Sequence, residues 1–298
     1  MRILVTGAAG AVGSYVPRVF TADELTLTDR RGDFRFLDVR DFEAVKATVA
    51  DVKPDLVLHL AAATDVDECE RNPDYAHSNN SVGTQNVALA VRDAGCELVY
   101  ISTAGVFWGD KPDPYDEFDV PRPANVYGVS KLAGERTVMS LLDRWYVVRA
   151  GWMVVGGALD HKFVGKIAEQ IRSGQTHLKA VDDKFGSPTY APDLLGVIQA
   201  VVAGGRHGLY HGVNRGMCSR FDVAVEITRI LDREEVDVEP VSSAFFPLAA
   251  PRARSEAMRN YMLELHGLHE TRPWQDALHE YVTQEVMPAL EARASATA

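Results

Sequence analysis

The stretch RILVTGAAGAVG, residues 2–13, decides the fold. Its first part, residues 2–6, is apolar and predicts a short buried strand. Three glycines then follow in a G-x-x-G-x-x-G spacing, which lets the backbone turn tightly and approach a pyrophosphate. A helix after such a loop would direct its free amides and positive dipole end toward the phosphates. We therefore expect these loop residues to contact a dinucleotide: Gly7, Gly10, Ala11, Val12 and Gly13.

Strands and helices are expected to alternate beyond this loop. Apolar runs predict strands at residues 25–29, 34–37, 56–60, 98–102 and 146–149, and helical spacing predicts helices at 40–52, 81–94 and 125–142. This alternation is typical of an α/β fold in which helices cover both faces of a parallel sheet. The sequence thus predicts a doubly wound Rossmann sheet, which binds ligands beyond the carboxyl ends of its strands.

An acidic residue ends the second expected strand. Asp29 at this position would accept hydrogen bonds from the adenosine ribose and repel a 2′-phosphate, which favours NAD. Arg30 and Arg31 follow directly and could bind that phosphate instead, or be solvated loop charges. The expected cofactor is therefore NADP or NAD. We also expect Arg30, Asp38 and Val39 to contact it.

Small residues follow the strand expected at 56–60. The alanines of HLAAAT, residues 59–64, would let a flat dinucleotide lie close to the backbone, although tight helix–sheet packing would also explain them. His59 lies inside the apolar strand, so we expect it to be a core residue. The cofactor contacts predicted from these strand ends are Leu60, Ala61, Ala62, Ala63 and Ser102.

The segment YGVSK, residues 127–131, carries the expected chemistry. Tyr127 and Lys131 are four residues apart and so share one helix face. A lysine ammonium near a phenol lowers the tyrosine pKa from ~10, so Tyr127 could exchange a proton near neutral pH. A Tyr–Lys pair on the surface of a helix would have the same spacing. The catalytic interpretation is favoured by the order of the motifs along the chain, which is the glycine loop, then the hydroxyl of Thr103, then Y-x-x-x-K.

The composition of the chain excludes several classes of function. Its 298 residues suffice for one large domain or two lobes, and 31 basic against 42 acidic residues give a net charge of −11, which argues against nucleic-acid binding. No apolar run reaches the ~18 residues of a membrane helix, and the initial strand leaves no room for a signal peptide. The cysteines form no zinc pattern or disulfide framework, so we expect no metal and a cytoplasmic location. They are Cys69, Cys96 and Cys218.

Several motifs together resemble the extended short-chain dehydrogenase/reductases, and within them the dTDP-4-dehydrorhamnose reductase family. They include PDLVLHLAAATDVDECE (54–70), YISTAGVFWGD (100–110), NVYGVSKLAGE (125–135), DDKFGSPTYAPDLL (182–195) and RARSEAM (252–258). The resemblance implies a Rossmann domain at residues 1–150 and roughly 184–214. It also implies a smaller C-terminal substrate-binding lobe at roughly 151–183 and 215–298.

The resemblance also implies roles for individual residues. Tyr127 would protonate the C4 carbonyl oxygen of a sugar, Thr103 would hydrogen-bond the same oxygen, and Lys131 would bind the nicotinamide ribose and tune Tyr127. Trp152 would line the sugar site, although an ordinary buried aromatic is an equal alternative. The residues expected on the substrate side are Thr64, Val66, Thr103, Ala104, Gly105, Trp152 and Thr189.

The pair Ala104–Gly105 limits what the resemblance implies. Related 4,6-dehydratases carry an acid–base pair here, so its absence speaks against dehydration. Rhamnose-forming reductases usually carry Asp-Tyr, so we expect a larger and less polar site beside Gly105. We therefore expect a 4-ketoreductase acting on a nucleotide-linked deoxysugar, with two alternatives: a nucleotide-sugar 4-epimerase with retained NAD, and a non-catalytic dinucleotide-binding regulatory subunit. A homodimer is one compatible oligomeric state.

Overall fold

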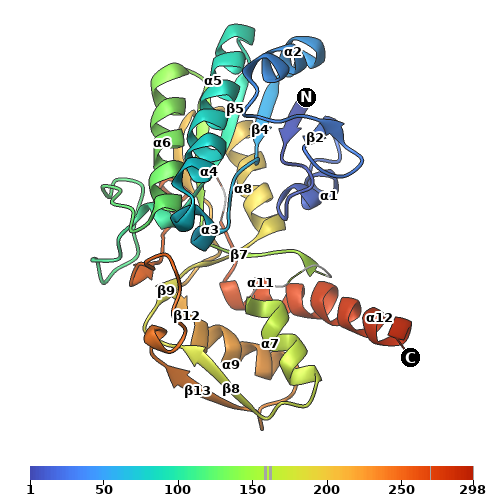
Figure 1. Ribbon diagram of the computed structural model, residues 1–298, viewed down its shortest axis with the longest axis vertical. Coiled ribbons are helices and arrows are strands. Elements are labelled where there is room, and N and C mark those ends of the chain that lie inside the picture. The colour runs from blue at the N-terminus through green and yellow to red at the C-terminus, as the bar shows by residue number, and fades with distance from the viewer. Residues whose placement is uncertain (158–159, 161–162, 269, 298) are drawn as a thin grey trace.

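A parallel sheet of seven strands forms the larger part of the molecule, at the top of Figure 1. The computed structural model describes residues 1–157, 160, 163–268 and 270–297. The strand order is β11-β6-β5-β4-β1-β2-β3, and each pair is parallel. The strands are β1 (Arg2–Thr6), β2 (Glu24–Asp29), β3 (Arg35–Phe36), β4 (Leu56–His59), β5 (Glu97–Thr103), β6 (Trp145–Ala150) and β11 (Gly208–His211). The expected α/β Rossmann class is confirmed, and the strand order reverses between β1 and β4.

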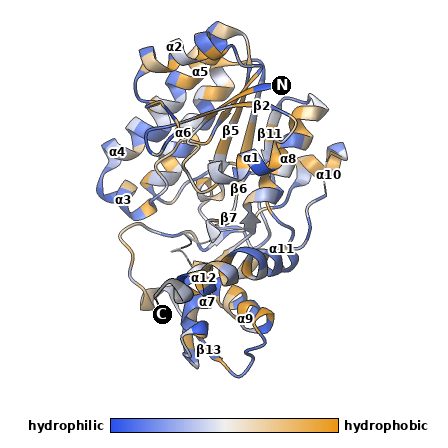
Figure 2. Ribbon diagram, turned by 90° about the vertical axis from the view of Figure 1, so that its right-hand side faces the viewer, coloured by the Kyte–Doolittle hydropathy of each residue, from blue (hydrophilic) through white to orange (hydrophobic). Residues whose placement is uncertain are grey.

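Helices cover both faces of this sheet because successive strand residues point to opposite sides. Ile3 and Val5 of β1 join a core cluster with α1 (Val16–Val19) and α8 (Ala191–Gly204). Leu4 points the other way, into a cluster with three more helices. These are α2 (Phe42–Val52), α5 (Gly83–Ala94) and α6 (Val126–Leu141). Figure 2 shows hydrophobic residues along the strands and hydrophilic residues over α4 (Pro73–His77).

The helix expected after the glycine loop is very short. A 3₁₀ turn at Gly13–Tyr15 leads into α1, which has four residues. The chain turns away at Phe20, and β2 already begins at Glu24, so little length is left for a helix. Phosphate contacts at this loop therefore depend on its own backbone amides rather than on a long helix dipole.

A second apolar cluster lies in the lower part of Figure 1. Its main members are helices and a parallel strand pair. These are α7 (Phe163–Arg172), α9 (Arg220–Ile230), α11 (Trp274–Tyr281), β8 (His177–Val181) and β13 (Asp237–Val241). A short parallel pair, β7 (Trp152–Val154) with β10 (Pro188–Tyr190), forms a separate two-stranded sheet. The two-domain boundaries named above remain a prediction.

No helix in the described ranges combines the length and the apolar character needed to cross a membrane.

Candidate active site

A cleft of about 620 Å³ opens at the carboxyl ends of β1, β4, β5 and β6. The glycine loop and residues that directly follow or end these strands line one side of it, among them Leu60, Thr103 and Gly151. Residues of the second apolar cluster, including Phe163 and Leu278, line another part. The cleft thus lies where ligands bind in open parallel sheets.

Two glycines of the loop are required by close backbone contacts. Gly7 has φ +77°, and a Cβ there would lie 2.6 Å from the backbone nitrogen of Ala61. A Cβ at Gly13 would lie 2.4 Å from the carbonyl oxygen of Gly7. A side chain at Gly7 would therefore push the loop away from the end of β4, and one at Gly13 would push against the start of the loop itself.

The loop also presents backbone amides that suit a phosphate. The Ala9 amide donates to Asp29 Oδ2 at 3.0 Å, which fixes the loop to the end of β2. Within the described residues, the amides of Ala11 and Val12 have no acceptor, and both residues line the cleft. Free amides beside a glycine turn are what a dinucleotide pyrophosphate binds. These residues therefore fit NAD(P).

The charged residues after β2 leave the choice between NAD and NADP open. Asp29 accepts from the amides of Ala9 and Arg31, at 3.0 and 2.9 Å. Arg31 lines the cleft, and its side chain is 80% exposed. Arg30 instead lies 3.9 Å from Asp38, outside the cleft lining. Arg31 is thus better placed than Arg30 for a 2′-phosphate.

Several residues predicted to contact the cofactor have other roles in the structure. Ser102 Oγ donates to Glu135 at 2.5 Å on the buried side of β5. The buried Ala63 donates its amide to Asn80 at 2.8 Å. Ala61 packs on Gly7, Val39 packs on Gly83, and Asp38 pairs with Arg40. None of these three residues lines the cleft, and neither do Asp29, Ser102 and Ala63. These residues make contacts within the protein and lie outside the cleft lining, and their contacts with the cofactor stay predictions.

The expected catalytic hydroxyls meet at the cleft. Thr103 ends β5, Tyr127 lies in the first turn of α6, and both line the cavity. The Thr103 hydroxyl accepts the Gly105 amide at 3.0 Å, and both Thr103 and the Tyr127 ring lie beside Gly105. Asn125 caps α6 through the Gly128 amide at 2.9 Å, which fixes the turn that carries Tyr127.

Lys131 lies one turn further along α6 and is 4% exposed. Its ammonium donates to the Ile101 carbonyl at 2.6 Å and lies 4.2 Å from the ring centroid of Tyr100. Burial lowers the pKa of Lys131 to about 7, and the Glu135 carboxylate opposes that shift. The side chain does not line the cleft directly.

The acidity predicted for Tyr127 is wrong for this structure. Burial raises the pKa of Tyr127 to about 12, and the hydrogen bond from Thr103 only partly opposes the shift. The reason is that the Lys131 ammonium is directed to the Ile101 carbonyl, and its own burial weakens its charge. Tyr127 therefore holds its proton at neutral pH, which is the state that a proton donor needs.

The Ala104–Gly105 pair lies directly against the two hydroxyls. Ala104 is 1% exposed, and Gly105 is buried. A Cβ at Gly105 would lie 3.4 Å from Thr103 Oγ1 and 3.6 Å from the Tyr127 ring. Neither residue supplies an acid or a base to the cleft.

The substrate side differs from the prediction at one of the predicted residues. Thr64, Val66 and Trp152 line the cleft as expected, but Thr189 is 1% exposed and accepts the Gly151 amide at 3.0 Å. We therefore assign Thr189 to positioning of the chain after β6. Sequence reasoning missed Glu256, which accepts the indole N–H of Trp152 at 2.9 Å.

Sequence reasoning also missed Arg220, whose guanidinium carbon lies 3.8 Å from the Trp152 ring centroid. Glu256 is 104 residues from Trp152 in the chain, so no local spacing could reveal these contacts. The only available signal was the family-like stretch 252–258, which contains Glu256.

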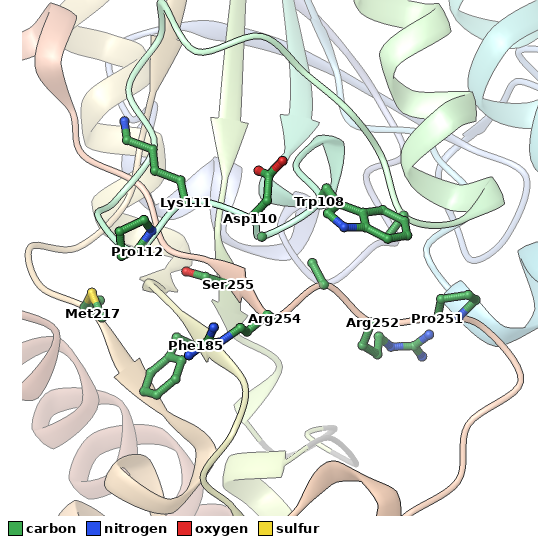
Figure 3. Close-up of a pocket in the computed structure, with 13 residues that line it drawn as sticks. Trp108, Asp110, Lys111, Pro112, Phe185, Met217, Pro251, Arg252, Arg254 and Ser255 are labelled. Carbon is green, nitrogen blue, oxygen red and sulfur yellow. The ribbon is translucent and has the colours of Figure 1, made fainter.

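A second cavity of about 460 Å³ adjoins the cleft, and Arg252 and Ala253 line both. Figure 3 shows Trp108 and Asp110 on one side of it and Phe185 with Met217 on another. Two of its charged groups have partners in the protein: Lys111 pairs with Asp119 at 2.6 Å, and Asp110 with Arg122 at 3.1 Å. The cleft with the hydroxyl pair is therefore the better candidate for catalysis.

Comparison with known proteins assigns the family. The family model described as the RmlD substrate binding domain matches residues 1–287. The dTDP-4-dehydrorhamnose reductase of Mycobacterium tuberculosis (strain ATCC 25618 / H37Rv) is 35% identical over 285 residues, covering 93% of this chain and 91% of the relative.

The chain belongs to the dTDP-4-dehydrorhamnose reductase family. It is thus an NAD(P)-dependent oxidoreductase of the extended short-chain type. A dTDP-4-dehydrorhamnose reductase from Clostridium acetobutylicum superposes with a TM-score of 0.88 at 36% identity, covering 95% of this chain and 98% of that one. The Bacillus anthracis family member, solved in complex with NADP, gives 0.87 at 34% identity, covering 94% and 98%.

Proposed function

We propose that this protein uses NAD(P)H to reduce the C4 keto group of a nucleotide-activated 6-deoxysugar, with dTDP as the nucleotide. The observation that carries the proposal is that Thr103 and Tyr127 lie together beside Gly105 and line the same cleft as the glycine loop. The names of the relatives support the choice of a dTDP-linked keto sugar.

The residues of the chain divide the chemistry among them. Bound NAD(P)H supplies the hydride. Tyr127, protonated at neutral pH, gives its proton to the carbonyl oxygen as that oxygen gains negative charge. The Thr103 hydroxyl donates a hydrogen bond to the same oxygen and stabilises the developing alkoxide. Lys131 would bind the nicotinamide ribose beside Tyr127, as the family resemblance implies.

Dehydration is a poor alternative for this cleft. Ala104 and Gly105 follow the catalytic hydroxyl and carry no ionisable group. Removal of water from a sugar needs a base for one proton and an acid for the leaving hydroxyl. A reduction needs only one proton donor and a hydride source.

The test is a panel of dTDP- and UDP-linked 4-keto-6-deoxysugars, with NADPH or NADH loss followed by absorbance. We expect stoichiometric cofactor consumption and a product with a C4 hydroxyl. Epimerisation predicts a retained cofactor without net consumption. A regulatory subunit predicts cofactor binding without turnover and co-purification of a partner enzyme. Either result would replace the reductase.

We also propose a cytoplasmic location. The three cysteines, Cys69, Cys96 and Cys218, are buried and free, which suits a reducing compartment. Fractionation of cells carrying the tagged chain tests this. The homodimer stays a prediction, and sedimentation equilibrium measures it directly.

A further inference from the structure

Arg220 is the one basic residue of the cleft lining without a hydrogen bond or ion pair to the protein, within the described part of the chain. The other basic residues have partners. Arg31 forms an ion pair with Asp29 at 4.0 Å, and Arg252 forms one with Asp67 at 3.1 Å. Lys184 donates a hydrogen bond to the Arg252 carbonyl at 2.9 Å. An unpaired guanidinium out of bulk water leaves several N–H donors unsatisfied, which costs stability. Such a group in a cleft indicates a ligand that accepts those bonds.

The protein fixes the position of this guanidinium by aromatic contacts. Its carbon lies 3.8 Å from the ring centroid of Trp152 and 5.2 Å from that of Phe163. Ser219 caps α9 at the start of the helix, so the backbone at Arg220 is also fixed. Burial lowers the pKa of Arg220 to about 10, which leaves it cationic at neutral pH. The donors are therefore held ready, with their charge intact.

This arrangement changes which group a substrate meets beside Trp152. The Gly186 backbone packs so closely on the indole that a Cβ there would lie 2.3 Å from the ring. Arg220 covers the indole as well, and Glu256 binds its N–H. A ligand on this side of the cleft thus meets a guanidinium rather than an open aromatic face.

We propose that Arg220 binds the diphosphate of the nucleotide sugar. This inference rests on the proposed function, because a dTDP-linked sugar carries a diphosphate. The planar guanidinium matches two phosphate oxygens at once. Figure 1 shows α9 in the lower part of the molecule, and Arg220 is its first residue, so a different segment of the cleft lining carries this guanidinium than carries the loop amides expected to bind the cofactor phosphates.

The experiment compares thymidine diphosphate with thymidine as ligands of the full chain, by calorimetry or by competition. The variant Arg220→Met keeps an unbranched apolar stem against Trp152 and removes the charge. We expect it to weaken thymidine diphosphate binding by about 10- to 100-fold and to leave thymidine affinity within about 2-fold. The affinity for NADP should stay unchanged, which shows that the fold and the cofactor loop are intact.

Two further variants keep the test sharp if Arg220→Met folds poorly. Arg229 lies on the same helix, and its side chain is 62% exposed and pairs with Glu226. The control variant Arg229→Met should therefore bind thymidine diphosphate and thymidine as the wild type does. Arg220→Lys keeps the charge without the fork and should give an intermediate loss.

Equal affinity of wild type and Arg220→Met for thymidine diphosphate would overturn this inference and leave the proposed function standing. An equal loss for thymidine diphosphate, thymidine and NADP would also overturn it, because it would indicate a structural role. If the wild type binds neither thymidine diphosphate nor uridine diphosphate, both this inference and the proposed function are overturned.

Discussion

The threonine and tyrosine hydroxyls carry the chemistry at the scale of single residues. Thr103 is fixed by the Gly105 amide at 3.0 Å, and Tyr127 by the capped start of α6. Because both side chains lie beside Gly105 and line the same cleft, a carbonyl oxygen placed between the two hydroxyls would receive two donors.

Replacing Thr103 tests the second donor. Thr103→Val removes the hydroxyl while keeping the side-chain shape, and we expect kcat to fall by about 10²- to 10³-fold. Thr103→Ser restores the donor and should recover most of the rate. Steady-state kinetics with a saturating keto sugar measures both, and equal rates for Val and Ser would exclude Thr103 as a donor.

The sequence predicted the identity of these residues better than their electrostatics. Y-x-x-x-K spacing correctly placed Tyr127 and Lys131 on one helix, but it suggested an acidic tyrosine. The pKa of a buried group depends on everything around it, and here burial outweighs the lysine. Arg220 and Glu256 could not be predicted, because they reach Trp152 from distant parts of the chain.

The glycine loop shows how an element depends on close approach. Gly7 combines a positive φ with contact to the Ala61 backbone. The spacing predicted this loop correctly, because glycines directly after a strand indicate a tight turn and a close approach of the backbone, which depend on neighbouring residues. It did not predict the short α1, because helix length there is set by how soon β2 begins.

A comparison of Gly7→Ala with Gly174→Ala separates the cost of backbone strain at a positive φ from the cost of a steric clash of the added Cβ. Both glycines have positive φ, at +77° and +88°, but an added Cβ at Gly174 meets nothing within 4 Å. Gly174→Ala should lose about 1–2 kcal/mol of unfolding free energy, and Gly7→Ala at least about 2 kcal/mol more, together with NADP affinity. Denaturant unfolding and a cofactor titration measure these. Equal effects of the two changes would contradict the close packing at Gly7.

At the scale of the whole molecule, Glu117 joins distant parts of the chain. One carboxylate oxygen accepts the His211 amide of β11 at 2.8 Å and the Met262 amide of α10 (Tyr261–His266) at 3.3 Å. The other oxygen is buried and has no partner within the described residues. Burial accordingly raises the pKa of Glu117 to about 7.

This shift makes stability depend on pH. The unfolded carboxyl titrates near 4.5, so between that value and about 7 the folded protein holds a proton that the unfolded chain has lost. The contribution of Glu117 to stability is therefore complete below pH 4.5 and is lost as pH rises to 7.

Glu117→Gln should remove this dependence. Relative to wild type, the variant should gain stability between pH 4.5 and 7, by at most about 3 kcal/mol, and the difference should then level off. Denaturant unfolding across pH 4.5–8 measures it, with the exposed Glu270→Gln as control. A difference that does not change with pH would contradict a buried, proton-holding Glu117.

The apolar runs that alternate with helical spacing in the sequence predicted the sheet, because such a run indicates a strand that is buried on both faces. The cleft itself was predictable only as a position, at the carboxyl ends of those strands. Its second wall comes from segments near residues 163, 220 and 278, whose approach to the glycine loop is a property of the folded whole.

Tyr127→Phe tests the central claim most directly. The change removes only the proton donor, so NADPH oxidation with a dTDP-4-keto-6-deoxyhexose should fall by about 10²- to 10⁴-fold while NADP binding stays at the wild-type value. Wild-type turnover by the Phe variant would contradict the account.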